Sequence, residues 1–113
     1  MKVTFAQEMQ LCRALLAAQG MSAEDAEILG SSVAHSDFTG IYSHGLSRFS
    51  NYLKRFANGA MKPDAALTIT NDTGSTVAYD CDNGCGVVSL THVYRQMAPR
   101  AKEYGIVIAT GRR

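Results

Sequence analysis

Tyr42-Ser43-His44-Gly45-Leu46-Ser47-Arg48-Phe49 is the segment on which the predicted architecture most depends. Ser43 is a good N-cap residue, because its hydroxyl can accept a backbone N–H that the first helical turn leaves unpaired. We therefore expect a helix that starts here and runs to about Gly59. Large apolar residues recur within it at helical spacing and predict one core-facing side: Leu46, Phe49, Leu53 and Phe56.

A second arc of the same helix carries polar groups with chemical potential. They are His44, Arg48, Tyr52 and Arg55. An imidazole can give or take a proton near neutral pH, and a guanidinium fork suits a carboxylate. A small acid with a carbonyl beside its carboxylate would fit this pair. The alternative is ordinary: a capping serine, a surface histidine and two solvated arginines.

The same residues carry a resemblance to a known family. Ser43-His44-Gly45 is followed by Arg48, Tyr52 and Gly59, then by Ala78-Tyr79-Asp80, by the Gly84/Gly86 pair and by residues 101–106. This series resembles the malate/L-lactate dehydrogenase family of the second type, which includes ureidoglycolate dehydrogenase, 2,3-diketogulonate reductase and sulfolactate dehydrogenase. The resemblance implies an oxidoreductase of 2-hydroxy and 2-keto acids that uses NAD or NADP. It also implies a homodimer and a fold that is not a Rossmann fold.

The resemblance also implies roles for individual residues. His44 matches a catalytic proton donor, and Arg48 matches the residue that holds the substrate carboxylate. Ser43 and Tyr52 are expected to help bind the substrate. Residues that bind the cofactor are not assigned, because nearly all such positions of the family lie further along the chain.

The chain departs from the family in length. Family members are several times longer than these 113 residues, and they reach a second histidine soon after the point where this chain reads Thr110-Gly111-Arg112-Arg113. We therefore expect the N-terminal part of such an enzyme, inactive in isolation. The alternative is a truncated product that acts only as a dimerisation or anion-binding module.

Composition narrows the class of protein. The hydrophobic fraction of 46% and charged fraction of 19% suit a soluble globular protein. No apolar run approaches the ~20 residues of a membrane span, and no signal peptide opens the chain, so a cytoplasmic protein without membrane contact is expected. Net charge is +1 and the pI is about 7.7, which argues against a nucleic-acid-binding domain built on a helix-turn-helix. Three cysteines, an odd number, fit neither a disulfide framework nor a metal site.

The first half of the chain predicts a helical unit over residues 1–62. Thr4 and Gln7 form a capping-box pattern at the start of a helix that Gly20 ends. Ser22 caps a second helix, which should stop before Gly40. The Ser-His-Gly-x-x-Arg element then opens the third.

The second half, residues 63–113, predicts the beginning of an α/β domain that would hold cofactor and substrate. Runs 67–70 and 75–80 flank a turn-like tetrad and read as a hairpin. The loop 82–86 reads as a tight turn rather than a phosphate cradle, with too little chain after it to complete a βαβ unit. A helix follows to about Tyr104, kinked or restarted near Arg95 because of Pro99, and 106–109 reads as a buried strand. The expected apolar face of the helix before this strand is Val87, Leu90, Tyr94, Met97 and Ala101. We therefore expect the fold class α/β (α+β), with a helical unit before a mixed sheet. The family resemblance implies a sulfolactate dehydrogenase-like fold.

Overall fold

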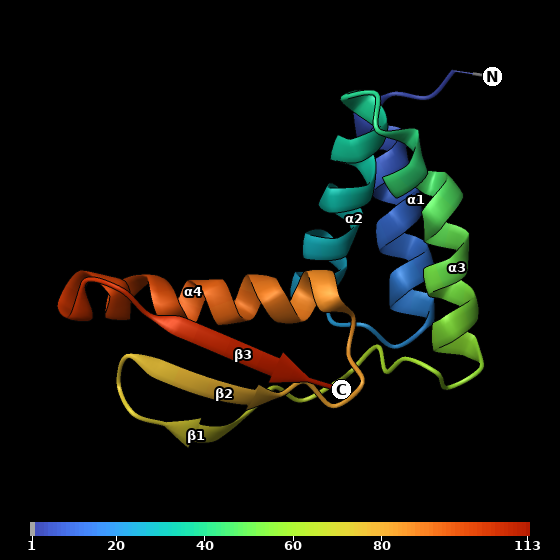
Figure 1. The fold of residues 1–113 in the computed structure, drawn as a ribbon. Helices are drawn as coiled ribbons and strands as arrows, with labels where there is room; N and C mark the ends of the chain where they lie inside the picture. Colours follow the sequence, from blue (N-terminus) through green and yellow to red (C-terminus); the bar gives the residue numbers. More distant parts are fainter. Residues whose placement is uncertain (1) are drawn as a thin grey trace. The chain divides into compact units, whose positions relative to one another are not determined.

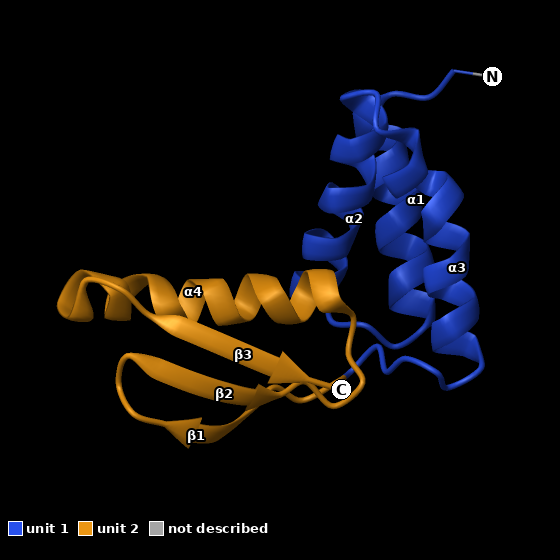
Figure 2. Cartoon of the chain, in the orientation of Figure 1, with its two compact units in different colours: residues 1–64 blue, residues 65–113 orange. Residues whose placement is uncertain are grey.

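The computed structural model describes residues 2–113, which form two compact units. Residues 1–64 make the first unit and residues 65–113 the second (Figure 2). The first is helical, and the second joins a small sheet to one helix (Figure 1). This mixed helix-and-sheet class is the one predicted, and the division falls two residues after the expected boundary. None of the described helices is long and apolar enough to cross a membrane.

Unit 1 contains α1 (Phe5–Ala18), α2 (Ala23–Phe38), the 3₁₀ turn η1 (Tyr42–His44) and α3 (Leu46–Ala57). The predicted capping box is confirmed, since Thr4 Oγ1 accepts from Gln7 N at 3.1 Å and Thr4 N donates to Gln7 Oε1 at 2.8 Å. Ser22 Oγ likewise accepts from Asp25 N at 3.1 Å. These caps set where α1 and α2 begin, because each hydroxyl accepts an N–H that the first turn of its helix leaves unpaired.

The core of unit 1 lies between α1 and α2 and extends to α3. Gly30 lets the first two helices approach closely, since a Cβ there would lie 3.1 Å from Cys12 Cβ. Phe49 and Phe56 bury the expected face of α3. The buried apolar side chains of α1 and α2 are Met9, Cys12, Leu16, Ala26, Ile28, Leu29, Val33 and Ala34.

The start of α3 differs from the sequence prediction. Ser43 lies inside η1 and does not cap α3, whose first residue is Leu46 with Gly45 as N-cap. The Asp37 carboxylate, nine residues earlier on α2, accepts the Leu46 N–H at 2.7 Å instead. A charged acceptor makes a stronger cap than a hydroxyl, so a residue from the preceding helix sets this boundary. His44 consequently precedes α3 and is not part of its first turn.

Unit 2 contains β1 (Thr68–Asp72), β2 (Thr76–Asp80), α4 (Gly86–Tyr104) and β3 (Ile108–Arg112). The predicted hairpin is confirmed, with β1 and β2 antiparallel. The strand order is β1-β2-β3, and β3 runs parallel to β2 from Thr76↔Ile108 to Asp80↔Arg112. The expectation of an incomplete βαβ unit was therefore wrong: β2, α4 and β3 make one, because the polar residues 110–112 continue the strand.

Two further expectations for unit 2 need correction. α4 packs on the sheet through Val93 and Met97, against Val77 and Tyr79 of β2, whereas Leu90 and Tyr94 of the expected face are exposed. The strand expected at 106–109 begins two residues later, at an edge of the sheet, and Ile106 and Ile108 are exposed. Pro99 lies within α4, which continues through it as one helix (Figure 1).

Candidate functional site

The turn before α3 carries the candidate proton-transfer group. Ser43 Oγ lies 2.9 Å from His44 Nδ1, and both side chains are exposed. The turn is closed by His44 N donating to Ile41 O at 3.0 Å and by Ser47 Oγ donating to Tyr42 O at 2.6 Å. Because Ser43 occupies Nδ1, Nε2 is the ring nitrogen left to meet a ligand.

The remaining predicted site residues lie on α3 itself. Arg48 is in the first turn and exposed, and Tyr52 follows one turn later and is half-buried. Their i, i+4 spacing puts them on the same side of the helix. The structure thus joins Ser43 and His44 directly and places Arg48 and Tyr52 along the helix that follows. The single polar face expected to run from His44 to Arg55 is interrupted at Gly45.

Asp37 and Gly45 belong to this site although the sequence reading assigned them no role. A Cβ on Gly45 would lie 1.8 Å from Asp37 Oδ1, so only glycine leaves room for the carboxylate that caps α3. The glycine of the Ser-His-Gly element is therefore required for the close approach of the Asp37 carboxylate. A positive φ is not the reason, since φ of Gly45 is −89°. The sequence signal that could have indicated this cap was Asp37, an acidic residue shortly before the turn at Gly40.

Glu8 is the second residue that sequence reasoning missed. It lies on α1 near the Asp37 side chain and is 3% exposed, and its Oε1 has no hydrogen-bond partner among the described residues. Burial, followed by the hydrogen bond and charge of Asp37, raises the pKa of Glu8 to about 7. The sequence signal was its position beside the apolar stripe, about 40° around α1 from Cys12 at ~100° per residue.

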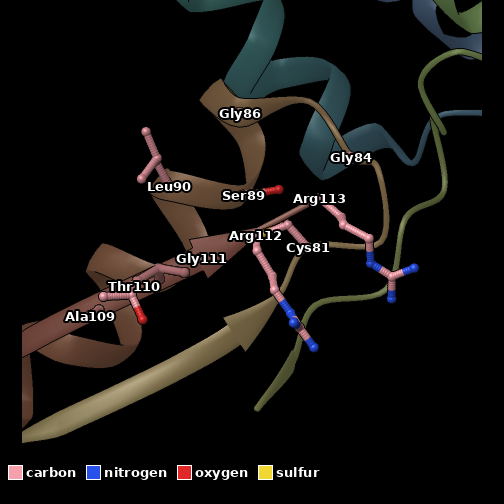
Figure 3. A pocket seen from close by; sticks show the side chains of 11 residues that line it. Cys81, Gly84, Gly86, Ser89, Leu90, Ala109, Thr110, Gly111, Arg112 and Arg113 are labelled. Atoms are coloured by element: carbon pink, nitrogen blue, oxygen red, sulfur yellow. The ribbon is translucent and has the colours of Figure 1, made fainter. Parts of the chain in front are cut away.

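A separate cavity of about 330 Å³ lies within unit 2. Figure 3 shows Ser89 and Leu90 of α4 on one side of it and residues 109–113 of the β3 segment on the other. The cavity sits at the carboxyl ends of the parallel strands, beside the start of α4, where α/β folds often bind ligands. Its volume is at the lower end of the ~300–1,000 Å³ typical of small-molecule sites.

The loop beside this cavity does not have the geometry of a phosphate cradle. Gly84 N, which a phosphate cradle would leave available, donates to Cys81 O at 2.8 Å. Asp82 and Asn83 have φ of 50° and 56°, the geometry of a tight type I′ turn. The Arg113 guanidinium pairs with the Asp80 carboxylate. The loop therefore works as a tight turn, as the sequence indicated.

None of the three cysteines forms a disulfide. Burial, with smaller effects from Glu8 and Asp37, raises the pKa of Cys12 to about 11. Over residues 2–113, no group of three or more His, Cys, Asp or Glu side chains is arranged to hold a metal ion.

Comparison with known proteins places the chain among dehydrogenases. Residues 3–113 match the family described as malate/L-lactate dehydrogenase. The chain is 31% identical over 113 residues to an L-lactate dehydrogenase of Cupriavidus necator, covering 100% of this chain and 32% of that protein. It is 29% identical over 106 residues to a 2,3-diketo-L-gulonate reductase of Citrobacter koseri, covering 94% of this chain and 32% of the relative.

Solved structures agree with the sequence comparison. Sulfolactate dehydrogenase of Methanocaldococcus jannaschii superposes with a TM-score of 0.92 at 27% identity, over 97% of this chain and 32% of that one. Malate dehydrogenase of Pyrococcus horikoshii, at 22% identity and a TM-score of 0.92, shares the fold. The chain spans about a third of the length of the curated relatives it matches. A family match over residues 3–113 and these relatives establish that the chain belongs to the malate/L-lactate dehydrogenase family.

Proposed function

We propose that the chain supplies the substrate-gripping N-terminal portion of an oxidoreductase that interconverts 2-hydroxy and 2-keto acids with NAD or NADP. The observation that carries this proposal is the 2.9 Å contact between Ser43 Oγ and His44 Nδ1 on an exposed turn directly before α3. The relatives named above, a lactate dehydrogenase and a diketogulonate reductase, support the reaction class.

Each side chain has a role in this proposal. Arg48 grips the substrate carboxylate through its two-pronged fork, and Tyr52 offers a hydroxyl one turn along. Ser43 fixes the His44 ring so that Nε2 faces the carbonyl oxygen. In the reductive direction His44 gives that oxygen a proton, and in the oxidative direction it takes the proton from the hydroxyl. The hydride belongs to the nicotinamide, and no residue of this chain is assigned to hold it.

A ligand titration of the labelled chain tests the proposal without requiring turnover. Pyruvate and oxaloacetate should perturb the NMR signals of His44 and Arg48, whereas hydroxyacetone, which lacks the carboxylate, should not. Arg48→Lys should weaken acid binding by roughly 10- to 150-fold, because it loses part of a charge-assisted contact worth ~1.5–3 kcal/mol. Arg55→Lys, an exposed arginine further along α3, is the matched control.

The same preparation addresses the alternatives. We expect no NADH or NADPH oxidation by the chain alone, because no residue of the chain is assigned to hold the nicotinamide. Turnover above a blank would contradict this expectation. Equal weakening by Arg48→Lys and Arg55→Lys would mean nonspecific attraction by a basic helix. Absence of any perturbation would favour a module that serves only for dimerisation.

A further inference from the structure

Two carboxyl groups from different helices meet inside unit 1. Glu8 of α1 is 3% exposed, and its carboxyl group lies close enough to that of Asp37 on α2 for the two to interact by hydrogen bonding and charge. Two carboxylates held this close repel unless a proton lies between them, and the burial of Glu8 strengthens the repulsion. The raised pKa of Glu8, about 7, means that this carboxyl keeps its proton through most of the acid range and can donate it to Asp37.

Asp37 also contacts the start of α3 and the turn that precedes it. Its Oδ2 accepts from Leu46 N at 2.7 Å, and its carboxyl group fills the space that any Cβ on Gly45 would need. Gly45 N in turn donates to Tyr42 O at 3.3 Å. A continuous series of contacts therefore leads from Glu8 through Asp37 to the turn that contains Ser43 and His44.

We propose that Glu8 is a positioning residue: by hydrogen-bonding Asp37 it holds the carboxyl group that caps α3, and so fixes the turn that carries Ser43 and His44. Its effect on proton transfer rests on the function proposed above, but its effect on the turn does not. Glu8 is too buried to meet a substrate and acts through Asp37.

The surroundings of the pair define what else can respond to pH there. On α1, the Cys12 thiol lies one turn after Glu8, and its pKa of about 11 keeps it neutral through the relevant range. On α2, Asp37 supplies the charge that bears on Glu8. From α3 the facing group is the Leu46 N–H. The imidazole of His44, on η1, lies two residues before Leu46, so the test is repeated with this side chain replaced.

The test is NMR on the labelled 113-residue chain, recorded in the natural sequence and in a His44→Gln background. In both, the Leu46 amide signal should move with the Glu8 carboxyl signal, with a midpoint near pH 7. In Glu8→Gln this transition should vanish, while exchange of the Leu46 amide stays within about twofold, because the glutamine amide still donates to Asp37. Glu103→Gln, which changes an exposed glutamate of α4, should leave the transition intact.

Glu8→Ala removes the donor and should speed exchange of the His44, Gly45 and Leu46 amides by about tenfold or more. Unchanged exchange in Glu8→Ala, or a Leu46 transition that persists in Glu8→Gln, would overturn the proposal. If Glu8→Ala fails to fold, the Glu8→Gln result decides alone. None of these measurements uses a keto acid, so failure of substrate binding and failure of the positioning role are seen separately.

Discussion

One acidic side chain in each unit, Glu8 in unit 1 and Asp72 in unit 2, has a strongly shifted pKa, and the two shifts have opposite signs. In unit 1, Glu8 is buried against another carboxyl group, and its pKa rises to about 7. In unit 2, Asp72 accepts hydrogen bonds from Arg100 and from Gly74 N, and its pKa falls to about 2. The hydrogen bond from Arg113 likewise lowers the pKa of Asp80. Glu8 of unit 1 is therefore protonated over most of the acid range, whereas Asp72 and Asp80 of unit 2 form ion pairs that hold the hairpin.

This difference predicts opposite pH dependences of stability. The folded state holds the Glu8 proton up to about pH 7, whereas the unfolded state releases it near the ordinary value of 4.5. The contribution of Glu8 is thus full below pH 4.5 and declines as pH rises to 7. Asp72 contributes fully above its ordinary 3.8 and loses that contribution as pH falls toward 2. Unit 1 should therefore lose stability as pH rises toward 7, and unit 2 should lose stability as pH falls toward 2.

Unit 2, unlike the helical unit 1, places exposed apolar side chains beside an edge strand. Cys12, Leu16 and Leu29 of unit 1 are fully buried. In unit 2 the most exposed large apolar side chains are those of Leu90 (70%), Tyr94 (73%) and Ile106 (72%). Exposed apolar groups beside an edge strand favour association. The two units should therefore respond differently to substitutions of the same kind.

Gly45→Ala should produce the largest effect. The new methyl group would lie 1.8 Å from Asp37 Oδ1 and 2.0 Å from its Cγ, so Asp37 must leave its place and the cap of α3 is lost. Overpacking together with loss of a cap should cost about 2–4 kcal/mol. Thermal unfolding followed by circular dichroism measures the loss, and exchange of the Leu46 amide localises it.

Gly86→Ala is the matched control in unit 2. Nothing lies within 4 Å of a Cβ built on Gly86, the first residue of α4. Alanine there should be neutral or stabilise by up to ~1 kcal/mol. Comparable destabilisation by both substitutions would mean that Gly45 is not singled out by Asp37.

Ile108→Lys should have an intermediate effect, on association rather than on folding. We expect unit 2 to carry a contact between two copies of the chain, because β3 is an edge of the described sheet. Ile108 is 57% exposed, and lysine on an edge strand opposes pairing. Sedimentation should show self-association of the natural chain, weakened about tenfold or more in the variant.

Thr68→Lys is the control for that experiment, because Thr68 is exposed on β1, at the other edge of the same sheet. It should leave association unchanged. A natural chain that sediments as a monomer at all concentrations would contradict the proposed contact, and an equal effect of both lysines would reduce it to charge repulsion.

The sequence predicted what depends on near neighbours. Thr4 and Ser22 were recognised as caps because their partners lie three residues away. The cap of α3 was assigned to Ser43 because Asp37 lies nine residues back on another helix, and local pattern does not measure that distance. The family resemblance found Ser43, His44, Arg48 and Tyr52, whose roles stay predictions, but it offered no reason to consider Glu8.

Tertiary packing decided the errors in unit 2. Leu90 and Tyr94 keep helical spacing with Met97, yet the side of α4 that meets the sheet is turned toward Val93. β3 extends into polar residues because the parallel ladder with β2 supplies hydrogen bonds whatever the side chain is. Periodicity therefore predicted the elements more reliably than the faces they bury.

The smallest effect is expected from Arg100→Gln, which removes the ion pair between α4 and the hairpin turn. Arg100 donates from Nη1 to Asp72 Oδ1 at 2.6 Å and from Nη2 to Oδ2 at 2.7 Å, and Nη1 also lies 3.3 Å from Gly74 O. Solvent partly screens this pair, so the variant should melt only about 2–4 °C lower at neutral pH. As pH falls, Asp72 becomes protonated and the pair is lost in the natural chain too. The difference in Tm should therefore shrink toward pH 2.

The carboxyl signal of Asp72 makes this prediction specific to the pair. Its midpoint, about pH 2 in the natural chain, should rise toward the ordinary value in Arg100→Gln, although Gly74 N still donates to Oδ1 at 2.9 Å and keeps it from returning fully. Lys102→Gln removes a positive charge from the same last turns of α4 and should shift neither the midpoint nor the acid limb. Since Glu8 lies in the other unit, its transition near pH 7 should be the same in all three chains. Movement of both transitions together would mean that the two units do not titrate independently, and the contrast between them would fail.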